Sequence, residues 1–154
     1  EMLNEARKNI LWLRKKFNNR LRIGLENNNY YPTKAYDIIA DADFISHIVR
    51  KNNLFFLFDL AHAQVTASNK KIDYQDYLKS LPMDLMIQMH ICRPRIHDNK
   101  ISHDTHYLPN KKMFEEIKLL TNKYKNLKFF TIEYYKNTEK LIESIIKLKK
   151  ILKM

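Results

Sequence analysis

The chain has 154 residues, a length that predicts one domain, residues 1–154. Apolar residues make up 45% of the chain and charged residues 29%, which excludes a wholly disordered protein. The one cysteine, Cys92, excludes a disulfide scaffold, a cysteine-based zinc finger and an iron–sulfur cluster. The single glycine, Gly24, excludes the glycine-rich loops that cradle phosphates.

The net charge is +11 at pH 7, which favours an anionic partner. Lysine carries most of this charge, and arginine is the better reader of phosphates and bases, so we do not expect nucleic acid to be that partner. No apolar run approaches the roughly 20 residues that cross a bilayer, and no charged-then-apolar leader opens the chain. We therefore expect a cytoplasmic protein with no membrane partner.

Helices and strands alternate along the first half of the chain. Apolar residues at helical spacing predict a helix over 3–19, and the run RIGLEN at 22–27 predicts a short strand. The same helical spacing returns over 38–49. The run LFFLFD at 54–59 is apolar at nearly every position, which predicts a strand buried on both faces. We expect a loop after it and then a short helix near 74–79.

The second half continues this alternation. The run LMIQMHI predicts a third strand at 85–91, and the polar stretch 92–110 is expected to be a loop. A helix is predicted around 114–124, a fourth strand at 129–134 and a last helix over 141–152. Strands separated by helices predict a parallel sheet with right-handed crossovers, and hence an α/β fold.

An ionisable residue stands at the carboxyl-terminal end of each of the four predicted strands: Glu26, Asp59, His90 and Glu133. In parallel α/β proteins these ends form the face that carries the active site. Each residue alone fits a cap, an ion pair or a hydrogen-bonded core histidine. Because such a group in an apolar run is costly unless it is paired or bound to a metal, the recurrence at all four strands favours a shared metal site.

Three more residues extend the set. His62 follows the second strand end, and Asp104 and His106 stand two positions apart in the long loop, where alternate residues point the same way. Oxygen and nitrogen ligands suit iron, manganese, zinc or magnesium, and a set of this size predicts two or more ions. The candidate metal ligands are Glu26, Asp59, His62, His90, Asp104, His106 and Glu133.

Arg93 and Arg95 flank Pro94 just beyond the third strand. We expect them to bind substrate by clamping a carboxylate or phosphate, with a merely solvated position as the alternative. Cys92 is expected to be a small, semi-buried thiol without a redox role.

Five segments, in order and spacing, resemble a known family: IGLENN, LFDLAHAQVTA, YLKSLPMDLMIQMHICRP, DTHYLP and FFTIEYY. It is the family of methanobactin-biosynthesis-type multinuclear iron enzymes, in the xylose-isomerase-like TIM-barrel superfamily. The resemblance implies two or three iron ions at the barrel mouth, dioxygen activation and modification of cysteines in ribosomally made peptides. It also implies a partner protein that recruits the leader. On that pattern the same seven residues match the metal ligands.

A full barrel of this kind has eight strands in about 250 residues, and only four strands are predicted here. We therefore expect a partial barrel, the C-terminal half, whose open edges favour self-association. The leading hypothesis is an iron-dependent oxidative enzyme acting on thiol-bearing peptides, although this chain alone is expected to lack part of the site. One alternative is a sugar isomerase or phosphodiesterase of the same superfamily, using magnesium, manganese or zinc. Another is an inactive partial barrel that serves as a binding subunit.

Overall fold

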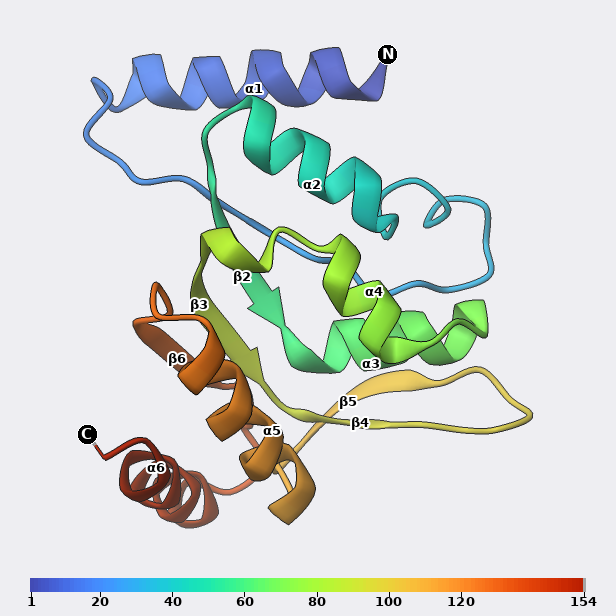
Figure 1. The fold of residues 1–154 in the computed structure, drawn as a ribbon, viewed down its shortest axis with the longest axis vertical. Helices are drawn as coiled ribbons and strands as arrows, with labels where there is room; N and C mark the ends of the chain where they lie inside the picture. Colours follow the sequence, from blue (N-terminus) through green and yellow to red (C-terminus); the bar gives the residue numbers. More distant parts are fainter. Residues whose placement is uncertain (154) are drawn as a thin grey trace.

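A computed structural model describes residues 1–153 of the chain (Figure 1). Its main sheet has four parallel strands in the order β1-β2-β3-β6. The strands are β1 (Gly24–Glu26), β2 (Phe55–Asp59), β3 (Met86–Ile91) and β6 (Phe129–Ile132). The α/β fold with a parallel sheet and alternating helices is thus confirmed.

Six α-helices accompany the sheet in the described residues: α1 (Met2–Lys16), α2 (Ala42–Lys51), α3 (Leu60–Lys70), α4 (Tyr74–Ser80), α5 (Lys111–Lys123) and α6 (Thr138–Leu152). A 3-10 turn at Met83–Leu85 leads into β3. The helices from α2 to α6 each begin at an aspartate or asparagine whose side chain accepts a hydrogen bond from a backbone N–H of the first turn. Such caps satisfy donors that the helix itself leaves free, and so fix where each helix starts.

Two segments differ from their predictions. The expected loop after β2 is instead the helix α3. Six of its eleven residues are buried, from Leu60 to Ala67, and they do not form a single apolar stripe against a polar face. The expected loop at 92–110 contains an antiparallel hairpin, β4 (Arg93–Arg95) with β5 (His103–Tyr107), made almost wholly of polar residues. Figure 1 shows this hairpin reaching away from the carboxyl end of β3.

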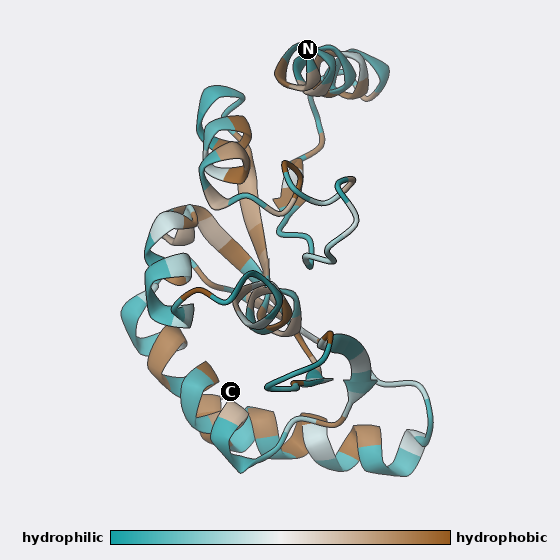
Figure 2. Ribbon diagram, turned by 90° about the vertical axis from the view of Figure 1, so that its right-hand side faces the viewer, coloured by the Kyte–Doolittle hydropathy of each residue, from teal (hydrophilic) through white to brown (hydrophobic). Residues whose placement is uncertain are grey.

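The core lies on one face of the sheet. Phe56, Phe58, Met89 and Ile91 are fully buried there, with helix residues such as Ile117 packed in the same cluster. Figure 2 shows the brown, apolar segments gathered in the strands and on parts of the surrounding helices. Burying these side chains is the main source of stability.

The opposite face of the sheet is only partly covered. Phe55 and Leu57 of β2 are half-buried, and Phe129 of the edge strand β6 is 56% exposed. The prediction of a strand buried on both faces was therefore wrong for β2. An apolar groove in front of β6 continues onto α6, between Phe129, Ile132 and Ile145.

The N-terminal helix α1 is loosely attached. Ile10 is its one buried residue, and Trp12 on the same helix is 62% exposed. Arg14 Nη2 ties the helix to the end of α2 by donating hydrogen bonds to the carbonyls of Asn52 (2.7 Å) and Asn53 (3.1 Å). Within residues 1–153, no helix has both the length and the apolar character needed to span a membrane.

Candidate metal centre

Six side chains form a closed ring of contacts at the carboxyl ends of the parallel strands. Carboxylates and imidazoles alternate all the way around it. The carboxylate–imidazole contacts are Glu26–His62 (3.7 Å), His62–Asp104 (3.4 Å), Asp104–His106 (3.2 Å), His106–Glu133 (3.4 Å), Glu133–His90 (3.0 Å) and His90–Glu26 (3.1 Å). We call these six residues the ring.

Asp59 lies against two members of the ring and is fully buried. Its Oδ1 accepts the backbone N–H of His62 at 2.7 Å and so caps α3, while Oδ2 lies 4.0 Å from Nδ1 of His90. In the described part of the chain, Oδ2 is the only buried side-chain oxygen or nitrogen without a hydrogen-bond partner. An unpartnered carboxylate oxygen of this kind is costly unless a proton or a cation accompanies it.

The electrostatics of Asp59 follow from this position. Burial raises the pKa of Asp59 to about 7, although the neighbouring charge of His62 opposes the shift. Burial also disfavours the charged form of His62, yet its hydrogen bond with Asp104 and the charge of Asp59 raise the pKa of His62 to about 9. Without a metal, protons therefore occupy this centre near neutral pH.

Asn27 holds the ends of β1 and β2 together behind the ring. Its buried amide donates to the carbonyl of Asp59 (3.0 Å) and accepts the N–H of Asp59 (2.8 Å). Its own carbonyl lies 2.9 Å from Nδ1 of His62. A proton on Nδ1 that is held this way leaves Nε2, the nitrogen facing Asp104, with a free lone pair for a metal.

Asp104 is oriented from the opposite side of the ring. Its Oδ1 accepts the Cys92 thiol (3.2 Å) and the backbone N–H of His106 (3.3 Å), so that Oδ2 faces the two imidazoles. Burial works against ionisation, but the hydrogen bonds from His62 and Cys92 lower the pKa of Asp104 to about 2. The positive φ of His106 (44°) turns this residue out of regular strand geometry.

His90 completes the ring from β3. Its hydrogen bond with Glu26, together with the charge of Glu133, raises the pKa of His90. Its other nitrogen, Nε2, lies 3.2 Å from the side-chain amide of Gln88. The ring therefore receives one imidazole nitrogen of His90, while Gln88 holds the other.

These residues are consistent with a metal site. Three groups bring ligand atoms within 4.8 Å of one another: Glu26, Asp59 and His62; Asp59, His90 and Glu133; and Cys92, His106 and Glu133. Asp59 and Glu133 each belong to two of these groups. The unpartnered oxygen of Asp59 also fits a bound cation.

All seven residues predicted from the sequence come together at this centre. Two neighbours of the ring were not predicted as part of the site: Cys92, which was expected to be only a semi-buried thiol, and Asn27, which was not singled out. Cys92 is fully buried against Asp104, and burial raises the pKa of its thiol. Its place directly after the third strand was the available signal. Asn27 gave no signal, because an asparagine after a strand more often marks a turn.

Arg93 and Arg95 do not belong to the ring. Both are exposed on β4, with their guanidinium groups against the aromatic side chain of Tyr107.

Comparison with known proteins places this sequence in a family. Residues 1–152 match the family described as RiPP precursor modification enzyme MbnB/TglH/ChrH. The chain belongs to this family.

Two relatives show how far the likeness extends. A UPF0276 protein of Caulobacter vibrioides is 33% identical over 67 residues, which are 44% of this chain and 24% of the relative. A UPF0276 protein of Nitrosospira multiformis is 26% identical over 85 residues, 55% of this chain and 30% of the relative. The matched part of the chain thus spans about a quarter to three tenths of the length of these two UPF0276 proteins.

Proposed function

We propose that this chain contributes the metal centre of an iron-dependent oxidative enzyme that modifies cysteine-bearing precursor peptides. The observation that carries the proposal is the closed ring of carboxylates and imidazoles around the unpartnered oxygen of Asp59, in a member of a peptide-modifying family. The family description supplies the peptide substrate.

The proposed ligands are Glu26, Asp59, His62, His90, Asp104, His106 and Glu133. Two or three iron ions bound there would supply one-electron chemistry with dioxygen and an attachment point for a thiolate. The chain's own residues would hold each ligand in place: Asn27 fixes the tautomer of His62, and Cys92 directs Asp104. The carboxylates would also accept the proton that a substrate thiol loses.

We also propose that residues 1–154 are one domain and that the sheet is part of a TIM barrel. One continuous core that draws on α1 through α6 supports a single domain. The parallel order β1-β2-β3-β6, with the candidate ligands at the carboxyl ends of the strands, supports a barrel segment. On this proposal β1 and β6 are edges that further strands would cover.

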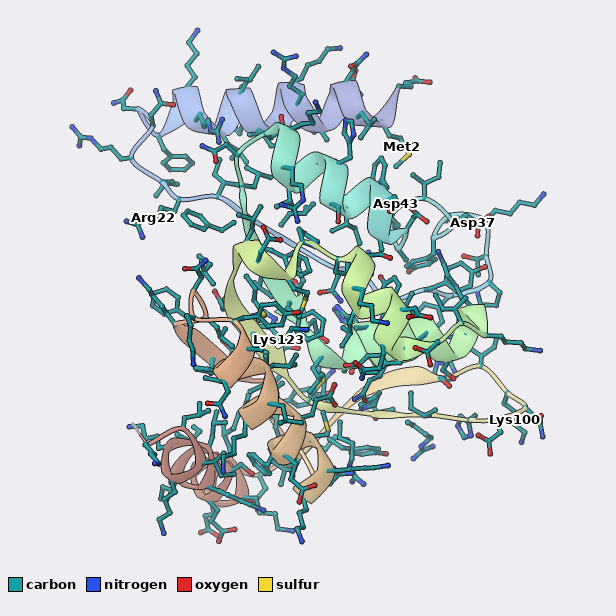
Figure 3. All side chains as sticks on the ribbon, in the orientation of Figure 1. Met2, Arg22, Asp37, Asp43, Lys100 and Lys123 are labelled. Carbon is teal, nitrogen blue, oxygen red and sulfur yellow. The ribbon has the colours of Figure 1, made fainter. Side chains whose placement is uncertain are left out.

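The test is metal content. The purified chain is loaded anaerobically with Fe(II), desalted and measured by elemental analysis together with its native mass. We expect two or more irons per chain or per assembled barrel. A Glu133→Gln variant should lose at least one of them, whereas an Asp43→Asn variant, changed at an exposed position of α2, should not (Figure 3).

The outcomes separate the rival functions. Oxygen and a cysteine-containing peptide, added to the loaded protein, should yield a product of changed mass. Retained zinc, magnesium or manganese without iron uptake would replace the proposal with phosphodiesterase or isomerase chemistry. A monomer that takes up no metal would instead be a binding subunit.

A further inference from the structure

Three cationic side chains surround one tyrosine on the hairpin beside the ring. Nζ of Lys136 lies 4.1 Å from the ring centroid of Tyr107, and the guanidinium carbons of Arg93 and Arg95 lie 5.5 and 5.7 Å from it. Nη2 of Arg95 also donates a 2.8 Å hydrogen bond to the Tyr107 hydroxyl. We call these four residues the Tyr107 cluster.

The charge of the cluster is not neutralised within the described residues. Among the described residues, the lysines and arginines that form ion pairs are all outside the cluster: Lys8, Arg50, Lys79 and Lys111. Arg93, Arg95 and Lys136 are exposed, and Tyr107 is half-buried beneath them. Three like charges gathered on one aromatic ring, without a carboxylate, form a site that favours an anion.

The hairpin fixes this arrangement. Arg93 pairs with Tyr107 and Arg95 with His103 across the two strands. The side-chain hydroxyl of Thr105 also donates to the carbonyl of Arg93 at 3.1 Å. Two guanidinium groups are therefore presented from a rigid strand, and guanidinium is the group that best matches the two oxygens of a carboxylate.

The cluster adjoins the metal centre at three places in the chain. Arg93 directly follows Cys92, and Tyr107 directly follows His106. Tyr135, the residue before Lys136, lies with its ring 6.1 Å from the imidazole of His106. Three members of the cluster thus stand next in sequence to residues at the ring, and no member of the cluster belongs to the ring.

We propose that the Tyr107 cluster binds a carboxylate of the peptide substrate and so holds the peptide while its cysteine reaches the ring. This inference rests on the proposed function for the identity of the substrate, and it specifies an acidic peptide. The carboxylate belongs either to an aspartate or glutamate side chain or to the peptide C-terminus. The net charge of +11 supports capture of such a peptide from a distance.

The experiment measures peptide binding by fluorescence anisotropy at two salt concentrations. The probes are fluorescein-labelled peptides that carry one cysteine and either four glutamates or four glutamines, each with a free or an amidated C-terminus. We expect the glutamate peptide to bind at least tenfold more tightly than the glutamine peptide. If the free C-terminus is the ligand, the peptides with a free C-terminus will instead bind more tightly than the amidated ones, whether they carry glutamates or glutamines.

The variants are an Arg93→Glu/Arg95→Glu double substitution and the single substitution Lys136→Gln. Lys136 precedes α6 and lies outside the hairpin strands, so its replacement leaves the strand pairing intact. We expect the double variant to lose acidic-peptide binding at least tenfold and Lys136→Gln about threefold. The control is Lys100→Glu, an exposed residue at the tip of the same hairpin (Figure 3).

Three results would overturn the inference. The first is peptide binding that is unchanged in both variants. The second is a loss of binding in the Lys100→Glu control as large as in the double variant, which would mean that net charge alone governs binding. Equal affinity for a single-stranded oligonucleotide of the same charge would show a general polyanion surface. Metal content is also measured on each variant, and the cluster variants should load iron like the wild type. A failure of this inference can then be distinguished from a failure of the proposed function.

Discussion

Asp59 has two roles, as the cap of α3 and as a candidate metal ligand, and this makes it the most informative single residue of the site. Its Oδ1 caps α3 while its Oδ2 stays buried without a partner. An Asp59→Asn variant keeps the size and the capping oxygen but removes the charge. We expect it to lose iron at least tenfold while the metal-free protein stays as stable as the wild type or gains stability, measured by elemental analysis and thermal unfolding in chelator.

The opposite pattern would contradict this assignment. A variant that unfolds more easily yet still binds iron at full stoichiometry would mean that Asp59 is a capping residue alone. Asp73→Asn, a change at the exposed cap of α4, is the matched control, because it affects a cap without touching the ring.

The same centre gives the metal-free protein a definite pH dependence. The fold raises the pKa of Asp59 from 3.8 to about 7, so its favourable contribution to stability is lost as pH rises through 7. It raises the pKa of His62 from 6.5 to about 9, and that contribution is lost as pH rises through 9. Asp104 acts in the opposite sense, but only as pH falls toward 2.

We therefore expect the unfolding temperature in chelator to fall by about 3–10 °C between pH 5 and pH 9. Thermal unfolding followed by circular dichroism measures this. The Asp59→Asn variant should lose the part of the slope between pH 5 and 7. An unfolding temperature that rises over this range would be incompatible with the protonated centre.

At the scale of elements, α3 anchors the β4–β5 hairpin. This hairpin carries two members of the ring, Asp104 and His106. The Asn69 amide donates to the carbonyls of Tyr30 (2.8 Å) and Ser102 (3.0 Å), and its oxygen accepts the N–H of Ser102 (2.7 Å). The Ser102 hydroxyl in turn accepts the N–H of His97 at 2.9 Å. The hairpin is thus tied to a buried helix at a fully buried serine.

An Asn69→Ala variant should therefore loosen the hairpin. We expect a loss of about 1–3 kcal/mol of stability, together with faster hydrogen exchange across β4 and β5 and weaker metal binding through Asp104 and His106. Asn99→Ala, at the exposed turn of the same hairpin, is the control. Unchanged exchange in the Asn69 variant would show that the strand pairing holds the hairpin without α3.

The elements also mark how far sequence reasoning reaches. The strands were predictable because their apolar runs end in charged residues, and helices α1, α2, α5 and α6 because one face alone is apolar. Helix α3 has apolar and small residues on nearly all sides, so its period is hidden. The hairpin has no apolar alternation, and contacts distant in sequence, such as those of Ser102, hold it instead.

The residues of the centre divide in the same way. Ligand candidates could be found because an ionisable group at the end of an apolar strand is conspicuous. The roles of their supporting partners could not, because Asn27 and Cys92 act through contacts that only the fold creates, although the place of Cys92 directly after β3 was a signal. No pattern in the sequence indicated that Lys136, which follows β6, would lie against the aromatic ring of Tyr107.

For the whole molecule, the uncovered face of the sheet is the dominant feature. Phe129 on β6 and Ile145 on α6 are exposed beside an apolar groove of about 560 Å³. An open strand edge next to exposed apolar side chains favours association with another sheet edge. We therefore propose that the isolated chain self-associates through this face.

Sedimentation velocity over a range of concentrations tests this proposal. We expect the wild type to populate dimers or larger species and Phe129→Lys to shift the population to monomer. Leu119→Lys, a change at a residue of α5 that is 69% exposed, should leave the distribution unchanged. A wild type that is monomeric at every concentration would remove self-association from the account.

The placement of the one tryptophan decides what fluorescence can report about this protein. Trp12 is largely exposed on a helix that is held by Ile10 and the two hydrogen bonds of Arg14 and that contributes no residue to the ring. Its emission should already be red-shifted in the native state and should respond to the detachment of α1 alone. Metal loading and the collapse of the centre would leave it silent, and the tyrosines around the ring, Tyr107 and Tyr135, are the native optical probes of that site.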